Sequence, residues 1–115
     1  MKYEREKLIK IMNELVNFCL RINMKDLDIN FSSHDNIGQV TVEGYCSNPP
    51  LERLKDLEYI LNSPRQEELE EYYWNLVGDG HGHQELEMVG TLVDAGSIGY
   101  EDNILKISIS RNQKH

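Results

Sequence analysis

A short glycine-rich stretch holds the residues whose types and spacing come closest to chemistry. Residues 78–82 read GDGHG, in which Gly78, Gly80 and Gly82 alternate just ahead of a helical pattern. Such a loop can hold a phosphate group through its backbone N–H groups and the positive end of the following helix. A lone glycine-rich loop is a weak signal, however, and the simpler interpretation is a flexible connection between two helices.

Two histidines in the same stretch offer a second kind of chemistry. His81 and His83 stand two residues apart, with Asp79 and Glu85 on either side. On a strand, side chains at this spacing point to one side, so both imidazoles could bind one metal ion. A glycine-rich loop does not fix that geometry. A solvated loop is therefore the favoured interpretation, and a metal or ligand site at His81 and His83 is the alternative.

Three consecutive aromatic residues mark a candidate interface. Tyr72, Tyr73 and Trp74 lie in a helical pattern over residues 63–77. Consecutive helical side chains point about 100° apart, so one buried face cannot hide all three. Tyr and Trp are common at protein interfaces. The pattern predicts a two-fold homodimer through these aromatics, and docking of a different protein or plain packing are the alternatives.

Hydrophobic periodicity places these candidates among helices and strands. Helices are predicted at residues 4–22, 51–61, 63–77 and 86–93, and strands at residues 26–31, 40–43, 98–100 and 105–109. This order, α-β-β-α-α-α-β-β, predicts an α+β fold. We expect one domain over residues 1–115, a two-layer α/β sandwich in which helices cover one face of a four-stranded mixed sheet. The uncovered face is expected to be polar, with Asn30, Thr41, Glu43 and Ser108.

Three residues predict local backbone features. Asn23 and Gly96 are expected to end the first and last helices in the left-handed conformation. Gly90 stands in the middle of a helical pattern, where glycine costs about 1 kcal/mol relative to alanine. A close approach of another helix or strand would offset that cost.

The composition excludes several classes of partner. The chain has 12 basic and 20 acidic residues, a net charge of −8, which argues against binding to a nucleic-acid backbone. No apolar run approaches the ~20 residues needed to span a bilayer, and the charged first residues do not resemble a signal peptide. Cys19 and Cys46 lack metal-binding spacing and are expected to be free thiols in a reducing cytoplasm, with Cys19 buried.

The first helix and hairpin resemble the start of the GHKL superfamily of ATPases, above all histidine-kinase and anti-sigma-kinase domains. In that family a pattern like E-L-x-x-N-A-x-x-H-G leads into two strands, and residues 14–23 here read ELVNFCLRIN. The resemblance implies that Glu14 takes the acidic position. The family's magnesium-ligand asparagine falls on Phe18, and Asn17 is one residue away, about 100° around the helix.

The later family motifs are matched unevenly. The family has D-x-G after the second strand, whose aspartate binds adenine, and residues 43–46 here read EGYC. Its G-x-G-x-G phosphate loop is matched by residues 78–82, and two predicted helices at residues 51–77 replace its ATP lid. The resemblance therefore implies the family's fold with most of its ligand residues replaced.

Three hypotheses of function follow. The favoured one is a non-catalytic regulatory or protein-interaction domain in bacterial-type signalling, without a cofactor. The second is a weak nucleotide-binding or anti-sigma-type kinase domain that holds ATP with Mg²⁺ through Glu14, Asn17 and the glycines of residues 78–82. The third is a small metal- or ligand-binding protein centred on His81 and His83.

Overall fold

The computed structural model describes residues 4–63, 68 and 85–113. These residues form three helices and four strands in the order α-β-β-α-α-β-β, which confirms the predicted α+β class. The elements are α1 (Glu4–Arg21), β1 (Lys25–His34), β2 (Ile37–Tyr45), α2 (Leu51–Leu61), α4 (Glu85–Leu92), β3 (Ala95–Glu101) and β4 (Ile104–Asn112). The further helix predicted over residues 63–77 lies outside the described residues.

The four strands form one sheet in the order β1-β2-β4-β3, and every neighbouring pair is antiparallel. The prediction of a mixed sheet was wrong. Two-residue turns, Asp35–Asn36 and Asp102–Asn103, join the strands of each hairpin, and all four turn residues have positive φ. Turns of that kind match the natural twist of antiparallel strands. Because β4 also docks antiparallel on β2, the described strands contain no parallel pair.

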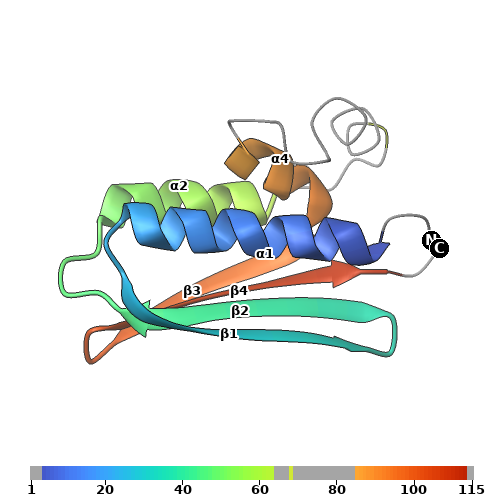
Figure 1. Cartoon of the computed structure of the whole chain (residues 1–115). Coiled ribbons are helices and arrows are strands. Elements are labelled where there is room, and N and C mark those ends of the chain that lie inside the picture. Colours follow the sequence, from blue (N-terminus) through green and yellow to red (C-terminus); the bar gives the residue numbers. More distant parts are fainter. Residues whose placement is uncertain (1–3, 64–67, 69–84, 114–115) are drawn as a thin grey trace.

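The helices cover one face of this sheet (Figure 1). On that face Val40 lies opposite Ile109, and Val42 lies opposite Ile107, and all four side chains are buried. The apolar stripe of α1, with Leu15 at its centre, packs onto them. Apolar residues that recur every two positions in the strands and about every 3.6 positions in the helices therefore form a single core, as a two-layer sandwich requires.

The end of α1 agrees with the prediction from the sequence, but the region after α4 does not. Asn23 has a φ of 67°, which confirms the left-handed end predicted there. Gly96 was predicted to end the last helix in the same way, and that prediction was wrong: α4 ends at Leu92 and Gly96 lies inside β3. Glycine is needed there for space, since a Cβ atom at Gly96 would lie 2.6 Å from Cβ of Leu61.

The outer edge of β3 is met by the residue that caps α2. The Asn62 side-chain amide donates to the Gly96 carbonyl at 2.9 Å, and the Gly96 N–H donates to Asn62 Oδ1 at 3.1 Å. The side chain thereby imitates a short piece of a neighbouring strand. This part of the β3 edge is therefore already paired within the chain.

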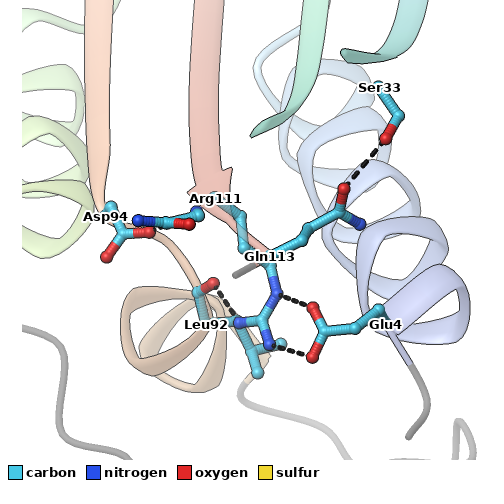
Figure 2. Close-up of polar contacts among 7 residues, drawn as sticks. Glu4, Ser33, Leu92, Asp94, Arg111 and Gln113 are labelled. Carbon is cyan, nitrogen blue, oxygen red and sulfur yellow. Dashed lines mark hydrogen bonds and ion pairs between the residues drawn. The ribbon is translucent and has the colours of Figure 1, made fainter. Parts of the chain in front are cut away.

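A buried arginine joins the last strand to two helices (Figure 2). Arg111 of β4 is fully buried, and its Nε and Nη2 each donate to a carboxylate oxygen of Glu4 at 2.9 Å. Its Nη1 donates to the Leu92 carbonyl at 2.7 Å. Arg111 thus holds together three segments that are far apart in the sequence: the first turn of α1, the end of α4 and the end of β4.

Gly90 provides a test of the helix packing. A Cβ atom there would lie 2.7 Å from Cγ2 and 2.9 Å from the backbone oxygen of Ile60, so the structure has the close approach that would offset the cost of this glycine. Gly90→Ala is expected to lower the free energy of unfolding by about 1–3 kcal/mol, because the overlap outweighs the gain in helix propensity. Denaturation in urea measures this change.

Gly99 is the matched control for that substitution. A Cβ atom at Gly99 has no neighbour within 4 Å, so Gly99→Ala is expected to leave the stability unchanged or slightly raised. A Gly90→Ala variant as stable as Gly99→Ala would show that α2 and α4 do not pack this closely.

Candidate functional site

The α1 position that corresponds to a magnesium ligand in the GHKL resemblance is filled by a core side chain. Phe18 is only 2% exposed and belongs to the hydrophobic core. Arg53 of α2 lies over its ring, with the guanidinium carbon 5.8 Å from the ring centroid. An apolar ring buried beneath a cation offers no oxygen ligand to Mg²⁺, which binds through oxygen atoms.

Neighbouring polar residues of α1 do not form a joint site. Glu14 is buried and accepts a hydrogen bond from Nζ of Lys10, one turn earlier, at 3.2 Å. Asn17 is exposed to solvent. The two residues predicted as nucleotide contacts therefore lie in different surroundings, and the carboxylate of Glu14 already has a cationic partner.

The other predicted site residues fall outside the described part of the chain. The phosphate-loop, metal-site and interface hypotheses built on them stay predictions. Within residues 4–63, 68 and 85–113, no three His, Cys, Asp or Glu side chains come together in a way that could hold a metal ion. The site residues outside these ranges are Tyr72, Tyr73, Trp74, Gly78, Gly80, His81, Gly82 and His83.

Both cysteines are free and buried. Burial raises the pKa of the Cys19 thiol from 9.0 to about 12, and the nearby Cys46 contributes to the same shift. Cys19 is therefore protonated at neutral pH, and a protonated thiol is a poor nucleophile. Its role is packing within the core, as its place in the apolar stripe of α1 predicts.

Hydrogen bonding by the Tyr100 hydroxyl holds the end of the β3–β4 hairpin in place. The Tyr100 hydroxyl donates to the Cys46 carbonyl at 2.6 Å and lies 3.1 Å from Oδ1 of Asn103. Desolvation raises the pKa of Tyr100, with smaller contributions from Cys46 and Tyr45. The phenol therefore stays protonated at neutral pH and acts as a hydrogen-bond donor. This contact ties the hairpin to the chain that leaves β2.

The first strand carries large apolar side chains that none of the described helices covers. Ile29 pairs with Val42 and Phe31 with Val40, so both side chains point to the helix-covered side of the sheet. Val40 and Val42 are fully buried there, yet Ile29 is 46% exposed and Phe31 is 41% exposed. Because α1 lies over β2 and the centre of the sheet, it leaves the same side of β1 open.

A row of apolar residues on α1 borders this open strip. Helical spacing places Ile9, Met12, Val16 and Leu20 on the side of α1 away from Phe18, which faces α2. Ile9 is 40% exposed and Leu20 is 54% exposed. We call the combined surface the α1–β1 flank. Its members are Ile9, Met12, Val16, Leu20, Leu27, Ile29 and Phe31.

The α1–β1 flank differs in chemistry from the open face of the sheet. The centre of that face is polar, as predicted: the hydroxyls of Thr41 and Ser108 are hydrogen-bonded at 2.9 Å, and Glu43 pairs across the strands with Lys106. Contiguous exposed apolar surface marks sites of interaction with proteins or other apolar partners. The flank is therefore a described surface that is suited to bind a protein.

Comparison with known proteins adds no family to these observations. No protein-family model matches the chain, and a search of curated proteins also found no match. None of the described helices is long and apolar enough to cross a membrane. A function for this chain is therefore inferred from the geometry of the described residues.

Proposed function

We propose that this chain is a non-catalytic regulatory or protein-interaction domain of bacterial-type signalling, built on an ATPase-like α+β fold without a cofactor. The observation that carries the proposal is the burial of Phe18 where the GHKL resemblance expects a magnesium ligand. The phenyl ring has no metal-binding atom. A nucleotide–magnesium complex at this place would have to displace a core side chain.

The charges around Phe18 support the same proposal. Arg53 lies over the ring, and the carboxylate of Glu14 is held by Lys10. A carboxylate engaged in a buried ion pair is costly to release, because its partner would be left as an unpaired charge. The acidic position of the resembled motif is thus used for structure.

The α1–β1 flank supplies the surface through which such a domain would act. Four of its apolar side chains are exposed and three are partly buried, all on a regular helix and strand, so little backbone ordering is needed when a partner covers them. Two free, buried cysteines suit a reducing cytoplasm, where we place the protein.

A thermal-shift experiment tests the absence of nucleotide binding. Wild-type protein in millimolar Mg²⁺–ATP is expected to melt at the same temperature as in Mg²⁺ alone. A ligand present at 100 times its Kd would add about 2.7 kcal/mol, which would raise the Tm by several degrees. A shift of that size that disappears in Gly80→Val would overturn the proposal and support the weak nucleotide-binding alternative.

A further inference from the structure

We infer that the α1–β1 flank binds a second copy of this chain, with the two β1 strands paired antiparallel about a two-fold axis at Phe31. The inference rests on the proposed interaction function and names its partner. It places the dimer contact on β1 instead of on the aromatic residues Tyr72, Tyr73 and Trp74.

The outer edge of β1 is open and only partly protected. Within the described ranges, no strand or side chain pairs with that edge, whereas Asn62 pairs with the β3 edge. Proteins guard exposed edges with charges, prolines and bulges. In β1 these protective features are found at the start of the strand, where Asp26 has a φ of 57° and the register is irregular. Residues 29–33, reading INFSS, have neither charge nor proline.

The hairpin determines which backbone groups face outward. Its two-residue turn closes on His34 and Ile37, and such turns close on a hydrogen-bonded pair. Backbone bonding alternates along an antiparallel strand, so residues 28, 30, 32 and 34 bond to β2. The N–H and C=O groups of Ile29, Phe31 and Ser33 then point away from the sheet and are available to another strand.

Symmetry restricts how two copies of β1 can pair. A two-fold axis perpendicular to the sheet keeps the helices of both copies on the same face and sets odd-numbered residues opposite odd-numbered ones. The regular part of β1, residues 28–34, has Phe31 as its midpoint. An axis there places the two Phe31 residues opposite each other and brings every outward-facing group of this segment to a partner.

Charge favours the same register. Within one chain Asp28 lies opposite Glu43, and like charges opposite each other are destabilising. The axis at Phe31 places Asp28 opposite His34 of the second copy and keeps the two Asp28 carboxylates at opposite ends of the interface. An axis at Asn30 would instead bring the irregular segment at Asp26 into the pairing.

The helices continue the contact above the strands. A Cβ atom at Gly38 would lie 2.6 Å from Cδ1 of Leu8, and Gly38 pairs with Ser33, so the first half of α1 lies above this part of the hairpin. Ile9 and Met12, on the flank side of α1, therefore stand near the axis. Three strand spacings of about 4.8 Å separate the two copies of β2, so the Ile29 and Phe31 side chains of both copies would fill the space between the two α1 helices.

Light scattering on matched variants tests the interface. Wild-type protein is expected to be a dimer at high micromolar concentration, and Phe31→Lys to weaken association at least tenfold while the melting transition is retained. Tyr59→Lys is the control, because Tyr59 is 78% exposed on α2 away from the flank, and it is expected to leave the dimer intact. A monomeric wild-type protein, or a dimer unaffected by Phe31→Lys, would overturn the inference.

Cysteine cross-linking tests the register without disturbing the core. In the inferred dimer Asn30 lies opposite Ser32 of the second copy in a pair without backbone hydrogen bonds, where Cα atoms are about 4.5 Å apart. That spacing suits a disulfide. A mixture of the single variants Asn30→Cys and Ser32→Cys is expected to form the cross-linked heterodimer upon oxidation, whereas Asn30→Cys alone is expected to stay uncross-linked.

The outcomes separate this inference from the proposed function. Absence of the cross-link in the mixture, or efficient cross-linking of Asn30→Cys with itself, would overturn the inferred pairing. Neither result bears on nucleotide binding, which the thermal shift measures. Cross-linking also uses polar positions outside the hydrophobic core, so it remains informative if Phe31→Lys fails to fold.

Discussion

Replacing Glu4 with alanine is expected to lower the free energy of unfolding by about 3–5 kcal/mol. The Glu4 carboxylate accepts two hydrogen bonds from Arg111, whose side chain is only 1% exposed. Without it, the guanidinium would keep its contact with the Leu92 carbonyl but would lose the ion pair and two charge-assisted hydrogen bonds to Glu4. Urea denaturation followed by circular dichroism measures the change.

Two further variants separate charge from packing at this site. Glu4→Gln keeps one acceptor oxygen, so it is expected to lose less stability than Glu4→Ala. The double variant Glu4→Leu, Arg111→Met removes both charges, and such replacements of buried ion pairs are often neutral. It is therefore expected to be more stable than Glu4→Ala. If Glu4→Ala itself cost under 1 kcal/mol, the ion pair would not hold α1 to β4.

Phe18→Ala is expected to lower the free energy of unfolding by about 3–5 kcal/mol, as the loss of a buried phenyl ring does in other cores. Phe18 is 2% exposed and packs in the core beneath Arg53. Because the ring is part of the core, its removal is expected to leave a destabilised protein that gains no affinity for Mg²⁺–ATP. Urea denaturation and thermal shift together test this.

Leu20→Ala is the matched control on the same helix. Leu20 is exposed in the single chain, so in dilute protein, where the flank is free, its truncation is expected to change stability by no more than ~0.5 kcal/mol. A Phe18→Ala variant as stable as Leu20→Ala that also gained an ATP-dependent Tm shift would contradict the account. In that case Phe18 would be a plug over a nucleotide site and not a core residue.

Local chemistry predicted the elements of this fold well. The periodicity of residues 4–22 and 51–61 corresponds to α1 and α2, and alternation in residues 40–43 and 105–109 corresponds to β2 and β4. Asn23 takes the left-handed conformation expected from its type. These features depend on neighbours along the chain, so periodicity and turn propensity are enough to find them.

Features that depend on distant segments were not predictable in the same way. The antiparallel pairing of β2 with β4 and the ion pair between Glu4 and Arg111 join residues far apart in sequence. The position of β1 at the edge of the sheet also depends on distant segments, because the pairing of β2 with β4 determines the strand order. Alternation gave the correct side for Ile29 and Phe31, but only the order of the strands leaves them exposed.

The same distinction between local and long-range features applies to the candidate site. That Phe18 stands where the GHKL resemblance expects a ligand can be read from a single motif, but its burial beneath Arg53 depends on how α2 packs on α1. The α1–β1 flank had no sequence motif of its own. A usable signal is a hairpin strand with apolar residues at alternate positions and an uncharged segment, as in residues 29–33, where a single helix cannot cover both strands.

Amide hydrogen exchange of the wild-type protein, measured residue by residue, tests the central claim most directly. In dilute protein the outward-facing amides of Ile29, Phe31 and Ser33 are expected to exchange rapidly, and at high micromolar concentration they are expected to become protected. Addition of Mg²⁺–ATP is expected to change no amide of α1. Protection near Phe18 by Mg²⁺–ATP, with the β1 amides independent of protein concentration, would contradict the account.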